Sequence, residues 1–350
     1  ANSRRSLSSS RLLSLQASPP LMPLKTKLTE ALGIKYPVIQ GGMHFVGYAE
    51  MAAAVSNAGG LGIITALTVA QPPKGKEALR DEIRKCRSLT DKPFGVNLTL
   101  LPVGVPPDYD GIIQVCIEEG VKIVETAGRN PEAVIKKFKE AGIYVIHKCV
   151  AVRHALTAQK MGADMISMDG FDCGGHPGEE DIGNWVLLAQ AAQELGVPFV
   201  ASGGSATGSQ LAAALAMGAE GINMGTRFMA TKEAPIHQNI KEALVKAKVT
   251  DTTHIFRTLK NTERVYKNAT AMQVKEIEEK NPGDFSAIGH LVKGENYRVS
   301  FQESGDAASS VWSCGQSIGL IKDIPTCKDL LENLVAEAED IIRNRLMSKL

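Results

Sequence analysis

Eight short apolar runs alternate with helical patterns over residues 36–228, and no other feature of the chain constrains its fold as strongly. The predicted strands are Tyr36–Gln40, Leu61–Ala66, Phe94–Leu100, Lys122–Ala127, Tyr144–Val150, Met165–Phe171, Pro198–Gly203 and Gly221–Phe228. Several of the intervening helical stretches end at a glycine, which a left-handed helix C-cap prefers. Buried strands joined by helical crossovers pair in parallel, so the pattern predicts an α/β fold with a parallel sheet.

Two architectures satisfy that description, the open doubly wound sheet and the closed (β/α)₈ TIM barrel. The count of eight strands favours the barrel. The dinucleotide-binding fingerprint G-x-G-x-x-G does not follow the first strand, where the chain reads Gly41-Gly42-Met43-His44. A phosphate-binding G-x-x-x-x-G-K-[ST] loop is also missing from the sequence. We therefore predict a (β/α)₈ TIM barrel with an inserted, C-terminal helical lid subdomain.

The composition divides the chain into four parts. Residues 1–23 are rich in arginine and serine and lack acids, which is typical of an organelle transit segment or of a disordered tail. Residues 24–248 carry the barrel pattern. The alternation of strand and helix patterns does not continue over residues 249–326, which we expect to form a lid or substrate subdomain over the barrel mouth. Residues 327–350 read as a C-terminal amphipathic helix that packs on the barrel.

Charge and cysteine content limit the partners and the compartment. The chain has 39 basic and 38 acidic residues, and aromatic residues make up 5% of it, so neither nucleic acid nor an anionic membrane is an expected partner. No apolar run is long enough to span a bilayer. The six cysteines form no C-x-x-C pair, which argues against a zinc site or a disulfide framework. We expect a small-molecule substrate and a reducing compartment, cytoplasmic or organellar, rather than secretion.

The stretch from Met165 to Gly178, MISMDGFDCGGHPG, offers the clearest candidate for proton transfer. An apolar strand breaks there into a glycine-rich turn that presents His176. The pKa of free histidine lies nearest to working pH, so this side chain is the expected catalytic residue. Cys173 has no evident partner besides His176, which favours a packing role.

Polar residues and glycines follow the other predicted strands, where a barrel collects its chemistry. Asn97, Glu125, Lys148 and Asp169 lie in otherwise apolar runs and would converge on one mouth, as hydrogen-bond partners for a heteroaromatic ring. Glycine-rich turns follow the last two strands, the positions where barrels often bind phosphate. Their residues include Gly203, Gly204, Asn223, Met224, Gly225 and Thr226.

Six ordered motifs make the chain from about Leu24 onward resemble the nitronate monooxygenase (2-nitropropane dioxygenase) family of FMN-dependent barrels. They are PVIQGGM, AAAVSNAGGLG, FGVNL, DGFDCGGHPG, ASGGSATG and NMGTRF. The resemblance implies that bound FMN contacts Gly42, Met43 and Asn97. It implies phosphate contacts from Gly203, Gly204, Gly225 and Thr226. It further implies that Gly174 and Gly175 back the isoalloxazine, with His176 as the catalytic residue.

Departures from the family pattern leave the substrate open. Asp169 stands where many members have glutamine, and QGGMHFVG replaces the usual QAPM, which is closer to a branch of NADH:quinone oxidoreductases. The chain is thus expected to oxidise small alkyl nitronates with dioxygen, or to pass electrons from NAD(P)H to a quinone. A flavin enoyl-thioester reductase is a lesser alternative, and a flavin-binding scaffold without turnover is a non-enzymatic one. The expected assembly is a monomer or homodimer.

Overall fold

Eight parallel strands form a barrel in the computed structural model, which describes residues 24–71, 73–100 and 107–349. The strands are β1 (Val38–Gln40), β2 (Gly62–Thr65), β3 (Phe94–Leu100), β4 (Ile123–Gly128), β5 (Tyr144–Cys149), β6 (Met165–Asp169), β7 (Phe199–Ser202) and β8 (Ile222–Met224). They are hydrogen-bonded in the order β1-β8-β7-β6-β5-β4-β3-β2, and a bridge between Ile39 and Leu61 brings the two ends together. The predicted TIM barrel is confirmed. The predicted tail, residues 1–23, lies outside the described residues.

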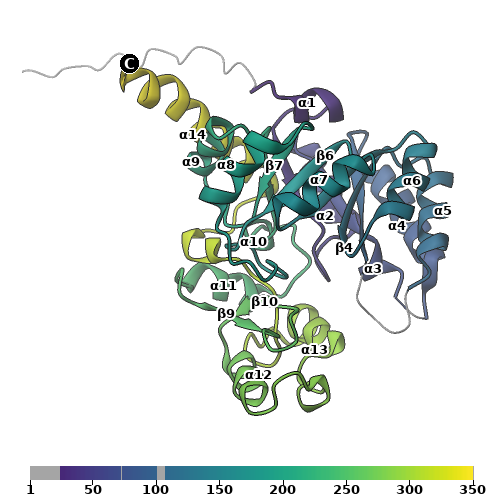
Figure 1. Ribbon diagram of the computed structural model, residues 1–350, viewed down its shortest axis with the longest axis vertical. Coiled ribbons are helices and arrows are strands. Elements are labelled where there is room, and N and C mark those ends of the chain that lie inside the picture. Colours follow the sequence, from purple (N-terminus) through teal and green to yellow (C-terminus); the bar gives the residue numbers. More distant parts are fainter. Residues whose placement is uncertain (1–23, 72, 101–106, 350) are drawn as a thin grey trace, which may run out of the picture.

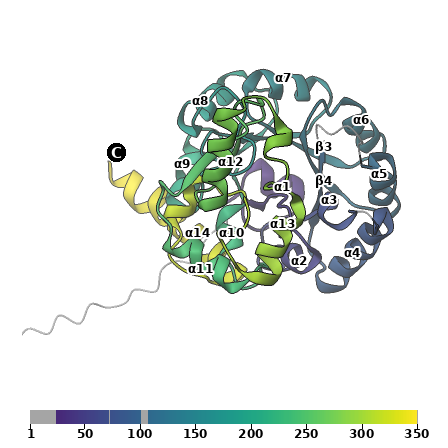
Figure 2. The same cartoon turned by 90° about the horizontal axis from the view of Figure 1, so that it is seen from below.

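Helices follow the strands and surround them as a ring, as Figure 2 shows. They are α2 (Ala49–Asn57), α3 (Ala66–Val69), α4 (Gly75–Leu89), α5 (Tyr109–Glu118), α6 (Glu132–Glu140), α7 (Val152–Lys160), α8 (Asn184–Glu194) and α9 (Gly208–Ala216). Each buries one apolar stripe. In α4 the buried residues Leu79, Ile83 and Cys86 recur at spacings of four and three, which places them on one face toward the strands.

A short helix closes one end of the barrel. α1 (Lys27–Leu32) buries Leu28 and Leu32 against the barrel-interior side chains of Ile39 and Ile63. Its N-cap Thr26 and Thr29 form a capping box, which fixes where the helix begins. Because this apolar plug fills the N-terminal end of the barrel, the carboxyl ends of the strands provide the accessible mouth.

The chain leaves the barrel after β8 and builds a second layer over that mouth, at the opposite end from α1 (Figure 1). This layer contains α10 (Thr226–Met229), α11 (Gln238–Lys246), the antiparallel hairpin β9 (Thr252–Ile255) and β10 (Glu263–Tyr266), α12 (Ala269–Lys280), η1 (Phe285–Ala287), α13 (Gly294–Val299), η2 (Ser300–Ser304) and η3 (Gln316–Leu320). The predicted strand Gly221–Phe228 is too long, because its last residues form α10. The segment also contains a hairpin where only helices and loops were expected.

The last helix returns to the barrel wall. α14 (Cys327–Asp340) buries Leu330, Leu331 and Leu334 and packs between α9 and α2, so it occupies the place of the eighth barrel helix. The chain continues through η4 (Ile341–Leu346) and η5 (Met347–Lys349). Across the described ranges, no helix is long and apolar enough to cross a membrane.

Candidate active site

A buried glutamate on β4 organises the floor of the barrel mouth. Glu125 Oε2 accepts hydrogen bonds from the Gly42 N–H at 2.9 Å and from Asn97 Nδ2 at 2.8 Å. Its Oε1 accepts one from Asn223 Nδ2 at 2.8 Å. The glutamate is fully buried, and each of its bonds goes to a neutral amide. One carboxylate therefore ties β3, β4 and β8 to the turn that follows β1.

Gly41 and Gly42, in that turn, pack so closely on these side chains that no larger residue fits at either position. A Cβ on Gly41 would lie 2.4 Å from Asn223 Oδ1, and one on Gly42 would lie 2.3 Å from Asn97 Cγ. Only glycine lets the backbone lie so close to the two amides. The floor lies beneath the cavity: Asn97 and Glu125 do not line it, whereas the turn does. The predicted contact of Asn97 and Glu125 with a cofactor stays a prediction.

A cavity opens above this floor between the strand ends and the overlying layer. Among the residues predicted from the sequence, its lining includes Gly42, Met43, Lys148, Asp169, Gly174, Gly175, Gly203, Gly204, Asn223, Met224, Gly225 and Thr226. The fold thus brings together nearly every predicted cofactor-binding residue. The layer over the mouth contributes Tyr297, Ser313, Gly315 and Ser317 to the same cavity.

A partly buried ion pair stands at one side of the cavity. Lys148 Nζ lies 3.3 Å from Asp169 Oδ2. Burial acts to lower the pKa of Lys148, but the nearby carboxylates of Asp169 and Glu125 outweigh it and raise that pKa, so the ammonium stays charged. Burial raises the pKa of Asp169 against the opposing effect of Lys148. Within the described part of the chain, Asp169 Oδ1 is buried without a hydrogen-bond partner, so this oxygen can accept a bond from a ligand N–H or O–H.

Two glycine turns supply backbone donors after the neighbouring strands β7 and β8. Gly203 and Gly204 adopt left-handed φ values of 81° and 73°. This conformation turns the chain sharply, and glycine adopts it without strain. Among the residues that the structure describes, no protein acceptor receives the N–H groups of Gly204, Ser205 or Thr226. These donors suit the phosphate of FMN.

The N-terminus of α9, by contrast, is already satisfied. Thr207 and Gln210 form a capping box there, and the Glu337 carboxylate of α14 accepts from the N–H groups of Gly208 and Ser209 at 2.8 and 3.2 Å. A carboxylate at a helix N-terminus compensates the same partial positive charge that would attract a phosphate. The N–H groups that remain free for a phosphate are therefore those of the turns rather than those of this helix.

His176 lies at the edge of the site. Its side chain is exposed, and it is not part of the cavity lining, although Gly174 and Gly175 just before it are. Its Nδ1 contacts the carbonyl oxygens of Thr262 at 3.1 Å and Asn261 at 3.2 Å. These carbonyls come from the loop of the β9–β10 hairpin. The catalytic role of His176 stays a prediction.

Cys173 lines the cavity, but as a packing residue. Its backbone and Cβ lie against Gly203, where a Cβ would approach Cys173 Cβ to 2.5 Å. Burial raises the pKa of the Cys173 thiol, which keeps it protonated and unreactive at neutral pH.

Sequence reasoning missed two rings that line the cavity, His44 and Tyr297. Burial lowers the pKa of His44 to about 4, so its ring is neutral. Its Nδ1 lies 3.0 Å from Thr68 Oγ1, and its Nε2 lies 3.3 Å from Gln71 Nε2. Tyr297, on α13, contacts the rings of His44 and Phe45. His44 directly follows the predicted Gly42–Met43 turn, a signal that could have identified it, whereas no local pattern marks Tyr297.

Comparison with known proteins agrees with this geometry. The family model described as nitronate monooxygenase matches residues 25–337. The chain belongs to the nitronate monooxygenase family. It is accordingly an enzyme, an oxidoreductase.

The similar proteins carry the names of more than one type of enzyme. The chain is 32% identical to the (3aS,4S,5R,7aS)-5-hydroxy-7a-methyl-1-oxo-octahydro-1H-indene-4-carboxyl-CoA dehydrogenase of Rhodococcus jostii, over 90% of this chain and 96% of that one. It is 30% identical to a probable nitronate monooxygenase of Staphylococcus saprophyticus, over 92% and 99%. The solved structure of FabK from Thermotoga maritima is 35% identical, with a TM-score of 0.85 and coverage of 93% and 100%.

Proposed function

We propose that the cavity binds FMN and that the enzyme uses it to oxidise small alkyl nitronates. The observation that carries the proposal is the donor and acceptor set around the cavity. Free backbone N–H groups at Gly204, Ser205 and Thr226 suit the phosphate. The Lys148 ammonium and the unpaired Asp169 Oδ1 suit the polar edge of the ring. When bound, FMN would accept two electrons from the substrate and pass them to dioxygen.

The substrate space favours a small, partly apolar anion. Met43, Met229 and Tyr297 give the cavity apolar surface, and the Lys148 ammonium, although paired with Asp169, can donate a hydrogen bond to an anion. An alkyl nitronate has a short apolar chain and a delocalised negative charge, which matches both features. The overlying layer, through Tyr297 and Ser313, covers part of the cavity, which strengthens the effect of the Lys148 charge there.

His176 would handle the proton. The carbonyl oxygens near its Nδ1 leave Nε2 as the nitrogen that can accept a proton from a neutral nitroalkane or hold the anionic nitronate in place. Neutral His44, with both ring nitrogens engaged by Thr68 and Gln71, would shape the cavity rather than move a proton.

The second candidate is a reductase driven by NAD(P)H, with a quinone or an enoyl thioester as acceptor. The similarity to FabK and to the CoA-linked dehydrogenase favours this candidate, since both resemble the chain over more than nine tenths of their lengths. The same cavity residues would serve, with His176 positioning the nicotinamide or protonating the reduced product.

Anaerobic mixing of the FMN-loaded protein with each donor separates the two candidates. Propyl-2-nitronate is expected to bleach the flavin absorbance within the turnover time, and air is expected to restore it. Bleaching by NADH or NADPH but not by nitronate would overturn the nitronate proposal. Restoring the absorbance with a quinone or with an enoyl thioester would then identify the acceptor.

A further inference from the structure

Glu179, three residues after His176, binds a single residue in the loop of the β9–β10 hairpin. Glu179 Oε1 accepts from the Thr262 N–H at 2.7 Å, and Oε2 accepts from Thr262 Oγ1 at 2.8 Å. Thr262 is buried at the loop of the β9–β10 hairpin. These two bonds hold the Thr262 hydroxyl and the peptide group that joins Asn261 to Thr262, whose carbonyl is that of Asn261.

The backbone that Glu179 holds is also the backbone that contacts His176. The Thr262 carbonyl lies 3.1 Å from His176 Nδ1, and the Asn261 carbonyl lies 3.2 Å from it. A carbonyl oxygen only accepts hydrogen bonds, so His176 Nδ1 must carry the proton. In the neutral ring the lone pair is then on Nε2.

We propose that Glu179 is a positioning residue, which holds the peptide group of the Asn261 carbonyl in place and thereby sets the tautomer and the ring orientation of His176. The catalytic part of this inference rests on the proposed function, in which His176 Nε2 handles the proton. The tautomer itself is a property of the chain, independent of the substrate.

Other contacts hold the same two segments together without touching Thr262. Arg257 pairs with Asp181 at 3.0 Å, and Arg264 donates to the Phe171 carbonyl from Nη2 at 2.8 Å. Gly175 and Arg264 exchange two backbone hydrogen bonds, at 3.1 and 2.7 Å. Because these contacts remain when Glu179 is removed, the hairpin is expected to stay docked while the peptide group between Asn261 and Thr262 becomes free to turn.

Nitrogen-15 NMR of histidine-labelled holoenzyme tests the inference directly. The chain has 7 histidines, and His176→Asn identifies the resonances that belong to His176. The wild type should show His176 with the proton on Nδ1. Glu179→Ala should give a mixture with the Nε2–H tautomer and slow flavin reduction by roughly ten- to a hundredfold.

Three further variants make the result decisive. Glu179→Gln can still accept from the Thr262 N–H and can donate to its hydroxyl, so it should retain the wild-type tautomer and rate. Thr262→Val keeps the carbonyl and loses the hydroxyl donor, so it should shift the tautomer partway. Arg257→Gln breaks a contact between the same segments and should leave both readouts unchanged. An unchanged tautomer in Glu179→Ala, or an equal change in Arg257→Gln, would overturn the inference.

Failure of the proposed function gives a different pattern. Full activity of His176→Asn with every donor would remove the catalytic role of His176 but leave the effect of Glu179 on its tautomer intact. A tautomer that ignores Glu179, in an enzyme that needs His176, would remove only the positioning role.

Discussion

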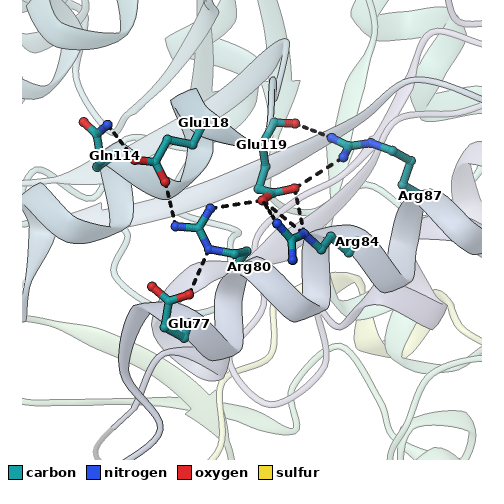
Figure 3. A network of polar contacts seen from close by, with 7 residues as sticks. All are labelled: Glu77, Arg80, Arg84, Arg87, Gln114, Glu118 and Glu119. Atoms are coloured by element: carbon teal, nitrogen blue, oxygen red, sulfur yellow. Dashed lines mark hydrogen bonds and ion pairs between the residues drawn. The ribbon is translucent and has the colours of Figure 1, made fainter.

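Two glutamates six positions apart each accept several hydrogen bonds, but in opposite settings. Glu119, after α5, accepts from Arg80 and Arg84 of α4, as Figure 3 shows; its own side chain is 8% exposed, but Arg84 is 60% exposed, so water reaches the arginine side of this network. Glu125, on β4, accepts from the neutral amides of Gly42, Asn97 and Asn223 and is 0% exposed. The first network lies on the outer wall of the barrel, and the second lies under the cavity.

The difference shows which network the site depends on. When an arginine on the surface loses its carboxylate, water replaces the bond, so exposed ion pairs contribute little to stability. A buried amide that loses its acceptor stays unsatisfied. The Glu125 network also positions the Gly42–Met43 turn, which lines the cavity. We therefore expect substitutions at Glu125 to affect stability and cofactor binding together, and substitutions at Glu119 to affect stability slightly.

The largest effect is expected for Glu125→Ala. The buried donors of Asn97 and Asn223 and the part-buried N–H of Gly42 would lose this acceptor, at a total cost of about 3–5 kcal/mol in the free energy of unfolding. The turn at Gly42 would lose its tie to the strands, so FMN affinity should fall as well. Urea denaturation of the FMN-free protein measures the first effect, and a fluorescence titration with FMN measures the second.

Glu125→Gln is the matched control, since it keeps the shape and one acceptor oxygen. It should be intermediate in both measurements, because its amide donor opposes one of the asparagine donors. Wild-type stability in Glu125→Ala would contradict the contrast between the two networks.

A buried histidine in the barrel wall gives an intermediate, pH-dependent effect. Burial lowers the pKa of His147 from 6.5 to about 4, and its Nδ1 lies 2.8 Å from Thr126 Oγ1. As pH falls below 6.5 the unfolded chain binds this proton and the folded chain does not, so the stability contribution is complete above pH 6.5 and is lost between pH 6.5 and about 4.

His147→Asn should reduce the slope of unfolding free energy against pH by up to about 1.4 kcal/mol per pH unit in this window. Denaturant titrations at several pH values measure that slope. The asparagine can still bond to Thr126, which makes it a mild replacement. An identical slope in both proteins would mean that His147 takes up its proton as readily in the folded chain as in the unfolded one, which would contradict the lowered pKa.

The smallest effect is expected at the surface. Hydrogen bonding from Arg84, followed by that from Arg80, lowers the pKa of Glu119 despite partial burial. Glu119→Gln should lower the melting temperature by no more than about 2 °C, and less at high salt. Thermal melts in low and high salt check this. A loss of stability in Glu119→Gln as large as that expected for Glu125→Ala would contradict the contrast between the two networks.

The barrel could be predicted because its signal is local and repeated. Each strand has its own apolar run, and each crossover helix has its own helical periodicity. Errors in the predicted ends of these elements therefore do not change the number of strands. The misjudged end of β8 illustrates the limit. An apolar run that includes Phe228 and Met229 fits a buried helix as well as a strand, and Gly225 ends the strand.

The layer over the mouth could not be predicted in the same way. β9 and β10 have four residues each, too few for the alternation of side chains to stand out. Tyr297 reaches the cavity from a helix far from any strand end, and its position depends on how the segment folds back. The contact between Glu179 and Thr262 likewise joins residues 83 positions apart. Long-range contacts of this kind leave no spacing in the sequence.

The most direct test of the account is FMN binding to a chain with a negative charge among the proposed phosphate donors. Ser205 lines the cavity, and its N–H lies free in the described structure. The wild type should bind one equivalent of FMN, whereas Ser205→Glu should bind at least about a hundredfold more weakly through repulsion of the phosphate, and neutral Ser205→Asn much less so. Equal affinity in wild type and Ser205→Glu, or no binding by the wild type, would contradict the assignment of this cavity to FMN.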